Sequence, residues 1–521
     1  MPESISRRRF LSGAAAVAAG VALSGPLPAA SAARRRSRVV VLGAGLAGLA
    51  AAYEIKKADR SVDVVVLEGQ NRVGGRVLTA RTDSDGVPFA DGLHVELGAH
   101  RIPSNHDRTL GYIRELGLDS QVVPFQDVLP DGSPSRRKFV LRDTAFYSDE
   151  PFPDVLELTP DERADVYAGY WYYETRFVSG QRPPSGSNML GRIVVPRFAA
   201  TDWPYGRSDR ASVDAWNSIT LEQFLAGNGA SADWIRFYKA ENGSEPSEIA
   251  ALPWLAQDVL HAKWFDTLYL QGGLDQIADG LAARLTAAGV PIRLEHEILS
   301  VTAGPSSTSV LYREPSGALR SIEAARVVCA LPFSALRYRG VDLSGAGLTA
   351  QKRYWIDNLP MVASARVALQ SSTRFWNSEG LEGLHLVGTD TALERIWHST
   401  STQPAGSGIL QAYLQSESAR NAPATGTIDW FAQQLAGVLP QVAGGGGWNG
   451  QGAAKLWHLD PWVRGAWASP GPGDLVEGFH VWGRPEGRIH FAGEHTSLFM
   501  GWMQGALESG QRASAEVLAA L

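Results

Sequence analysis

Continuous apolar runs flank a helix-like segment near the start of the chain. The run Arg38–Leu42 leads into a glycine-rich turn and then into an alanine-rich segment that extends to Tyr53. A second apolar run, Val62–Leu67, follows and ends at Glu68. Apolar runs without polar alternation are typical of strands buried on both faces, so this order predicts a strand–helix–strand unit in a parallel sheet.

The pattern changes after this unit. Residues 105–248 are rich in aromatic and charged side chains and lack repeated strand signals. We therefore expect a mainly helical block, with a helix over Pro160–Arg176 and a loop at Gln181–Asn188. Strand and helix signals resume at Thr267, and they predict a helix at Ile277–Ala288 and strands at Val290–Leu294, Ile298–Val301 and Ala325–Leu331.

Longer alternating segments, such as Ala363–Gln370 and Gly408–Gln415, then predict an antiparallel sheet. The final block, 487–521, returns to strand, turn and helix. The expected fold class is therefore α/β, with a discontinuous Rossmann-like domain built from residues 37–104, 249–335 and 451–521. Residues 105–248 form a helical subdomain, and 336–450 form an inserted mixed-sheet substrate-binding domain.

The first 32 residues predict an export signal of the twin-arginine (Tat) type. Arg7, Arg8 and Arg9 precede Phe10-Leu11 and an Ala/Val/Gly stretch, and Ala30-Ser31-Ala32 offers a small-residue cleavage site. The apolar stretch is short and broken by prolines, so we do not expect stable membrane insertion. The mature protein is expected to be secreted or periplasmic, which is compatible with a homodimer.

Charge and cysteine content exclude several classes of function. The net charge of −6 and the absence of a basic stripe argue against nucleic-acid binding. Cys329 is the only cysteine, so no disulfide within the chain and no cysteine-based metal site can form, and no metal is predicted. Cys329 lies in an apolar run and is expected to be a buried, inert thiol.

Gly43, Gly45 and Gly48 form a G-x-G-x-x-G turn between the first strand and the helix. These glycines allow a tight turn, a close approach of backbone to a pyrophosphate, and close packing of the helix on the strand. Glu68, about 20 residues further on, could bind ribose hydroxyls, although a solvated carboxylate at a strand end is the alternative. The pattern indicates a dinucleotide and leaves both FAD and NAD open.

Two further motifs narrow the choice. Arg72-Val-Gly-Gly-Arg-Val77 follows Glu68, and Arg488-Ile-His-Phe-Ala-Gly-Glu494 lies near the C-terminus. With these, the chain resembles the flavin amine oxidase family of monoamine, polyamine and L-amino acid oxidases, from about Arg38 to the end. The resemblance implies FAD as cofactor, oxidation at the carbon beside an amine, and molecular oxygen as acceptor. It does not imply covalent attachment of FAD, because no cysteine lies near the closing turn.

Carried over residue by residue, the resemblance implies a set of FAD-binding positions. They are Gly43, Gly45, Leu46, Ala47, Gly48, Glu68, Gly69, Gly75, Arg76, Gly98, Ala99, His100, Arg101, Ile298, Glu494, Gly501, Trp502, Met503, Gln504, Gly505 and Ala506. The helix after Gly501 would point its N-terminus at the electron-rich edge of the flavin.

The prediction of the substrate site depends on the segment Glu96-Leu-Gly-Ala-His-Arg-Ile-Pro103, which resembles the corresponding segment of L-amino acid oxidases. Arg101 is the residue expected to fork onto a substrate carboxylate, with an internal ion pair as the alternative. Tyr413 is expected to help bind that carboxylate, with core packing as the alternative. Gly501 and Trp502 complete the substrate site, where Trp502 faces the flavin ring, and Trp457 and Trp467 are further candidates for its lining.

One position departs from the family pattern. Arg366 occupies the place of a lysine that holds a water near the flavin, in a strand before Phe375-Trp376. Arginine stays charged and is bulkier than lysine, so we count Arg366 among the catalytic candidates together with Arg101, Tyr413 and Trp502. His100, His261 and His495 are candidate bases or polar liners, and structural roles are the alternative.

The resulting hypothesis is oxidative deamination of an L-amino acid to a keto acid, ammonia and hydrogen peroxide. The partners are an amino acid or amine and molecular oxygen. The alternatives are a primary amine or polyamine oxidase, a flavin dehydrogenase or decarboxylating oxygenase in which Arg366 alters the fate of reduced flavin, and a flavin-carrying binding protein without turnover.

Overall fold

The computed structural model describes residues 37–81, 89–90, 92–125, 135–160, 162–163, 210–243, 245–260, 267–403, 406–443 and 447–521. Residues 37–521 form one compact unit. The export signal expected at residues 1–32, the loop at Gln181–Asn188, His261 and nearly all of the helix at Pro160–Arg176 lie outside the described residues.

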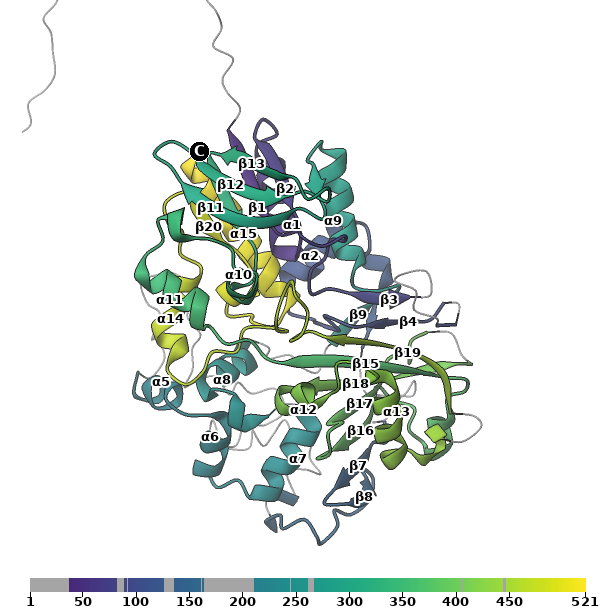
Figure 1. Cartoon of the computed structure of the whole chain (residues 1–521). Coiled ribbons are helices and arrows are strands. Elements are labelled where there is room, and N and C mark those ends of the chain that lie inside the picture. The colour runs from purple at the N-terminus through teal and green to yellow at the C-terminus, as the bar shows by residue number, and fades with distance from the viewer. Residues whose placement is uncertain are drawn as a thin grey trace, which may run out of the picture. The chain divides into compact units, whose positions relative to one another are not determined.

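A parallel sheet of five strands organises the first layer, in the order β10-β2-β1-β14-β20. Its strands are β1 (Arg38–Leu42), β2 (Asp63–Leu67), β10 (Ile292–Arg293), β14 (Arg326–Cys329) and β20 (Ile489–Phe491), and all pairs are parallel. Figure 1 labels β1, β2 and β20 of this sheet, near α1 (Leu46–Ala58) and α15 (Met503–Ala520). Val39, Val40 and Val41 are fully buried because both faces of the sheet are covered. The sheet is therefore the predicted discontinuous Rossmann-like unit.

Each face of this sheet belongs to a different apolar core. On one face Val39 and Val41 pack with helices α1, α9 (Gln276–Ala287) and α15. On the other face Val40 and Leu42 pack with an antiparallel sheet of three strands, β11 (Glu297–Ala303), β12 (Thr308–Arg313) and β13 (Leu319–Ala324). Helices α10 (Phe333–Tyr338), α11 (Ala350–Asn358) and α14 (Asp474–Trp482) complete this second core.

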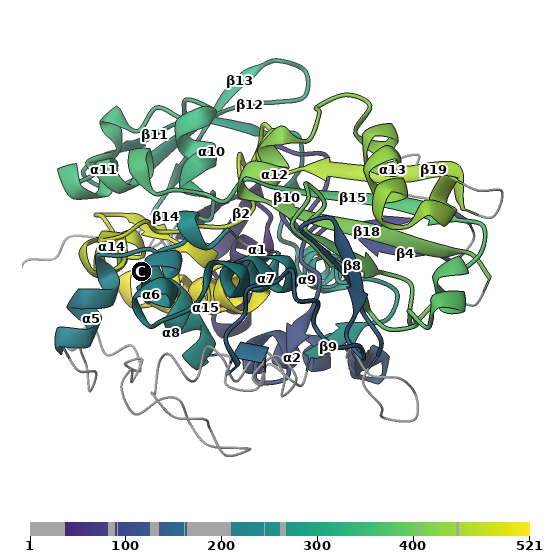
Figure 2. The ribbon, with the colours of Figure 1, turned by 90° about the horizontal axis from the view of Figure 1, so that it is seen from below.

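A second large sheet has seven strands in the order β19-β15-β18-β17-β16-β7-β8. Its strands are β7 (Lys138–Leu141), β8 (Thr144–Tyr147), β15 (Ser364–Ser371), β16 (His385–Thr389), β17 (Arg395–His398), β18 (Gly408–Gln415) and β19 (Trp448–Leu456). All pairs are antiparallel except β16 with β7. Helices α12 (Ser416–Asn421) and α13 (Thr427–Val438) lie along this sheet (Figure 2).

Smaller elements connect the two sheets. Strands β3 (Thr79–Arg81) and β4 (His94–Glu96) pair with each other, and β9 (Thr267–Leu270) pairs with β5 (Ile102–Pro103) and β6 (Val122–Pro124). The described helices of the 105–260 region are α2 (Asp107–Glu115), α5 (Arg210–Asn217), α6 (Leu221–Gly227), α7 (Ala232–Asn242) and α8 (Ala251–Leu260). Short 3₁₀ helices lie at Asp119–Gln121, Pro246–Glu248, Ser344–Ala346, Phe375–Glu379, Pro440–Ala443 and Glu494–Thr496.

Nowhere in the described part of the chain does a helix have both the length and the apolar character that crossing a bilayer requires.

Two features differ from the sequence prediction. The block 105–248 contains β6, β7 and β8 in addition to helices, and β7 and β8 extend the sheet that was assigned to 336–450. These strands are only three or four residues long, too short for a period-2 pattern to emerge. The boundary expected after residue 450 falls inside β19, whose glycines and polar residues hide the strand from a hydrophobicity pattern.

Candidate active site

One large cavity of about 960 Å³ lies between the parallel sheet and the seven-stranded sheet. The turns after the carboxyl ends of β1, β2 and β14 line one part of it, with Gly43, Glu68 and Ala330. Residues of β15, β17 and β18 line another part. Ligands of open α/β sheets bind at the carboxyl ends of the strands, so the first part is where a dinucleotide would lie.

The glycine turn has the close packing that the motif predicts. A Cβ on Gly48 would lie 2.0 Å from the carbonyl oxygen of Gly43, so only glycine lets α1 approach β1 this closely. Gly45 is the N-cap of α1 and offers no side chain to the free N–H groups of the first turn. Gly45, Leu46 and Ala47 all line the cavity. These backbone donors at a helix N-terminus suit a pyrophosphate.

Glu68 lies at the end of β2 and is buried at 6% exposure. Its carboxylate accepts hydrogen bonds from the backbone N–H groups of Ala44, at 2.7 Å, and Gln70, at 2.8 Å. Burial raises the pKa of Glu68 above its ordinary value, against the effect of these hydrogen bonds. The side chain is thus fixed beside the glycine turn, and the solvated strand-end alternative does not describe it.

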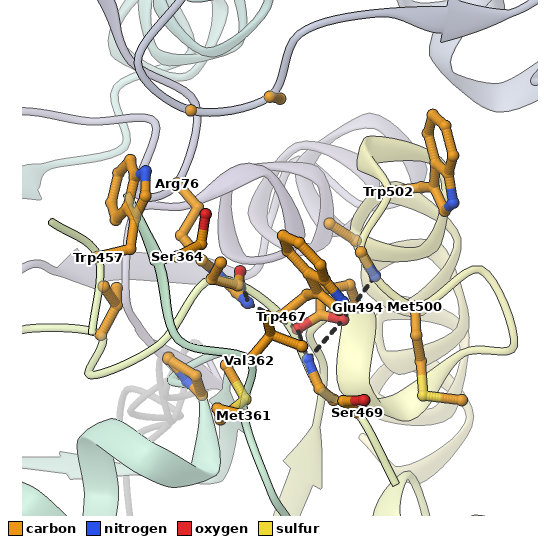
Figure 3. A pocket seen from close by; sticks show the side chains of 18 of the residues that line it. Arg76, Met361, Val362, Ser364, Trp457, Trp467, Ser469, Glu494, Met500 and Trp502 are labelled. Carbon is orange, nitrogen blue, oxygen red and sulfur yellow. Dashed lines mark hydrogen bonds and ion pairs between the residues drawn. The ribbon is translucent and has the colours of Figure 1, made fainter. Parts of the chain in front are cut away.

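Glu494 links three segments of the cavity wall. Its Oε1 accepts a hydrogen bond from Arg76 Nη1 at 2.6 Å, and its Oε2 accepts one from the backbone N–H of Gly501 at 2.9 Å (Figure 3). The N–H of Ala468 also points at this carboxylate, and Arg76 donates a second bond to the carbonyl of Ala466 at 2.9 Å. The buried carboxylate therefore holds the GGR turn, the 466–468 loop and the closing turn together.

The closing turn requires a glycine at its first position. Gly501 has φ of +79°, and a Cβ there would lie 3.2 Å from Cγ of Trp467. The next residue, Trp502, lines the cavity, and its indole N–H donates to Gln257 Oε1 at 3.2 Å. Trp457, Trp467 and Trp502 all stand around the pocket (Figure 3).

Arg101 lines the cavity and lies among aromatic rings. Its Cζ atom is 5.7 Å from the ring centroid of Trp397 and 5.8 Å from that of Trp502. A guanidinium beside aromatic rings gains a favourable cation–π attraction. The structure thus places Arg101 in the cavity, as the sequence predicted.

Tyr413 and Arg366 face each other across the strand pair β15–β18. Arg366 is 3% exposed, its Cζ lies 3.5 Å from the Tyr413 ring centroid, and it donates to Gln411 Oε1 at 3.3 Å. Burial lowers the pKa of Arg366 to about 10, so it remains charged at neutral pH. Burial raises the pKa of the Tyr413 hydroxyl, which stays protonated and able to donate.

Of the candidate histidines, His100 and His495 lie within the described residues, and only His100 lines the cavity. His100 lines the cavity and packs edge-on against Trp397, and burial holds its pKa well below the ordinary value. It is therefore neutral at pH 7. His495 is buried against Phe333, with ring centroids 4.5 Å apart, and does not line the cavity, so its candidacy as a base is not supported.

Most of the predicted positions line this one cavity. The exceptions are Gly48, Gln504 and Gly505. Gly48 packs α1 on β1, as described. Gln504 accepts hydrogen bonds from the N–H groups of Arg108 and Thr109 at the start of α2, so its amide serves a helix end. A Cβ on Gly505 would lie 2.3 Å from the carbonyl oxygen of Phe499, which shows a packing role.

The sequence reasoning did not find several lining residues. Among them are Trp397 and Arg395 of β17, His385 of β16, Trp462 and Gln257. The run Arg395-Ile-Trp-His398 does carry a signal, because a period of two places Arg395 and Trp397 on the same face of a strand. A charged residue within an otherwise apolar strand is rare unless it faces a partner or a site.

A parallel sheet with a glycine turn, a buried acid at the end of the second strand and an aromatic-walled cavity define a dinucleotide-dependent redox enzyme. A model of the flavin-containing amine oxidoreductases matches residues 46–518, and the chain belongs to that family. It is thus an oxidoreductase with a flavin cofactor, and the cradle at Gly45, Leu46 and Ala47 fits the pyrophosphate of FAD.

Similar proteins agree with this family. The flavin-dependent L-tryptophan oxidase of Lentzea aerocolonigenes is 28% identical over 492 residues, which cover 91% of this chain and 97% of that protein. An L-amino-acid oxidase of Mus musculus is 27% identical over 500 residues, covering 92% and 70%. A putrescine oxidase structure has a TM-score of 0.70 at 19% identity, covering 93% of this chain and 99% of that one, which confirms the α/β fold.

Proposed function

We propose that the protein is an FAD-dependent L-amino acid oxidase. The observation that carries the proposal is the place of Arg101, which lies inside the cavity with its guanidinium near the rings of Trp397 and Trp502. A simple amine has no carboxylate that would need such a group. Relatives whose names specify L-amino acids or L-tryptophan give independent support.

The cavity residues can orient an amino acid for oxidation at its α-carbon. Arg101 offers two parallel donors to the α-carboxylate, which fixes the orientation of the substrate as well as its charge. The protonated hydroxyl of Tyr413 adds a further donor. Removal from water and the positive charge of Arg101 and Arg366 disfavour an ammonium, so the amine binds in its neutral form. FAD, held at Gly45, Leu46 and Ala47, would supply the two-electron acceptor for the α-hydrogen, and oxygen would take up the two electrons as hydrogen peroxide. The amine loses a proton as the imino acid forms, and water hydrolyses the imino acid to a keto acid and ammonia.

We also propose that FAD is held without a covalent bond to cysteine. Cys329 is buried in β14, does not line the cavity, and burial raises the pKa of its thiol to about 11. Acid precipitation of the holoenzyme should therefore leave all of the flavin in the supernatant.

The test uses the purified holoenzyme, mixed without oxygen with L-amino acids, D-amino acids and simple amines while flavin absorbance is followed. We expect bleaching by L-amino acids, and peroxide in equal amount to substrate once oxygen is admitted. Bleaching only by amines without a carboxylate would refute the proposal. Bleaching without peroxide would instead identify a dehydrogenase, the outcome that Arg366 in place of lysine makes worth testing.

Arg101 provides the sharper prediction. Arg101→Gln keeps most of the side-chain volume but removes the charge and the fork, which should raise KM for an L-amino acid by about 100-fold, from about 2–3 kcal/mol of charge-assisted hydrogen bonding. Arg353→Gln, an exposed position on α11, is the matched control and should change nothing. An unchanged KM in the Arg101 variant would remove this residue from the substrate site.

A further inference from the structure

Among the residues that the structure describes, Arg395 is a buried guanidinium without a carboxylate partner. It begins β17, is 7% exposed and lines the cavity. Within the described residues, its guanidinium lies near the ring of Trp397, whose centroid is 4.9 Å from Cζ. No ion pair or side-chain hydrogen bond joins it there to any other group. A buried charge in this state is costly unless a ligand supplies the opposite charge.

Four other arginines of the cavity wall are neutralised by the protein itself. Each has a glutamate partner: Arg76 with Glu494, Arg137 with Glu241, Arg339 with Glu297 and Arg420 with Glu248. The remaining lining glutamate, Glu68, accepts backbone N–H groups. No lining carboxylate among the described residues is thus left over for Arg395.

Positive charge is concentrated at the end of the cavity where Arg395 lies. Arg366 contacts the neutral groups Gln411 and Tyr413, and Arg101 lies across Trp397 from the same region. The charges of all three arginines act on His100 in the same direction, toward the neutral form. A substrate with one carboxylate, held by Arg101 as in the proposed function, would leave Arg395 without an anion.

We propose that Arg395 is a second anion-binding residue of the substrate site, and that the substrates are acidic L-amino acids. Its guanidinium holds the side-chain carboxylate while Arg101 holds the α-carboxylate. The proposal rests on the proposed function, because it names the class of amino acid that the same site takes. The methylene groups between the two carboxylates lie against the apolar ring of Trp397.

The distances allow this arrangement. The Cζ atoms of Arg101 and Arg395 lie 5.7 and 4.9 Å from the Trp397 ring centroid, so their separation cannot exceed the sum of these two distances. A bidentate pair places the guanidinium and carboxylate carbons about 4 Å apart, and the carboxyl carbons of aspartate or glutamate are roughly 4 to 5 Å apart. A dicarboxylate that bends over the ring is therefore long enough to span this separation.

The test compares each acid with its own amide, which differs in charge but hardly in size. Holoenzyme is assayed with L-glutamate, L-glutamine, L-aspartate, L-asparagine and L-tryptophan, by anaerobic flavin bleaching and by peroxide formation. We expect kcat/KM for the better acid to exceed that for its amide by about 30-fold or more, the value of roughly 2 kcal/mol for a charged hydrogen-bonded contact. Arg395→Gln should abolish that preference by reducing turnover of the acid alone, and Arg395→Lys should retain part of it.

A binding measurement separates this inference from the proposed function. Glutarate and its monoamide cannot be oxidised, and their binding is followed by the shift of the flavin spectrum. Tighter binding of glutarate in the wild type and in Arg353→Gln, lost in Arg395→Gln, supports the second anion site even if the amine donor were misassigned. Equal turnover of acid and amide, or an equal loss for all substrates in Arg395→Gln, would overturn the inference while leaving the L-amino acid oxidase proposal intact.

Discussion

Replacing Glu494 by glutamine tests whether this carboxylate organises the flavin site. One oxygen serves Arg76 and the other serves the N–H of Gly501, so both acceptor positions are in use. Glutamine keeps the shape but turns one acceptor into a donor and removes the charge. Either Arg76 or the closing turn must lose its partner.

The size of the effect follows from burial. Breaking a buried ion pair by removing one partner costs about 3–5 kcal/mol. The side chain of Glu494 is 6% exposed but that of Arg76 is 21% exposed, so water recovers part of the loss. We therefore expect the loss of the Arg76–Glu494 ion pair to cost about 2 kcal/mol. FAD binding must then reorder segments that the wild type holds in place, which should weaken FAD binding about 30-fold.

The assay titrates apoprotein with FAD and follows quenching of flavin fluorescence. Glu314→Gln is the matched control, because Glu314 pairs with Arg320 at 3.4 Å on the surface, where such pairs contribute little. Glu494→Asp retains the charge and should bind FAD better than the glutamine variant. If Glu494→Gln binds FAD as tightly as the wild type, the carboxylate is not the organising group that the geometry indicates.

Two other predictions concern stability and export. Burial raises the pKa of Glu96 to about 8 from an ordinary 4.5, so the protonated form is favoured in the folded state. The contribution of the Glu96 carboxyl to the free energy of unfolding is fully present below pH 4.5 and is lost as pH rises toward 8. Glu96→Gln should make the free energy of unfolding fall less steeply between pH 5 and 8 in denaturant titrations, and identical slopes would contradict this. We also propose that residues 1–32 direct Tat export. The double substitution Arg7→Lys and Arg8→Lys should keep the protein in the cytoplasm of a Tat-competent host, which cell fractionation would measure. Undiminished export of this variant would disprove the signal.

The cofactor half of the molecule was predictable because its signals are local. The turn from Gly43 to Gly48 lies between a strand and a helix that adjoin it in sequence, and the glycines report the close approach of their own neighbours. The turn at Gly501 is likewise specified by the residues around it. Such motifs need no knowledge of distant pairing.

The substrate half was less accessible to sequence reasoning. Strands β7 and β8 join the seven-stranded sheet only through the parallel pair of β7 with β16, across more than two hundred residues of chain. Arg395 could not be identified from the sequence for a related reason. It is notable because no carboxylate among the described residues pairs with it, and only a structure shows which carboxylates are already paired with other groups. The side chain of Gln504 reaches α2, a contact with a distant segment that its position next to the flavin turn does not indicate.

The order of strands in the parallel sheet also constrains how the chain folds. β1 is near the start of the chain, yet β20 is completed only at Phe491, and α15 packs on α1 so closely that a Cβ on Gly510 would lie 2.5 Å from the carbonyl oxygen of Ala47. Pairings this distant in sequence form slowly, and N-terminal segments emerge from the ribosome first. The face of α1 that packs on α15 therefore has no partner until α15 has been synthesised, and the cofactor cradle can close only after that point.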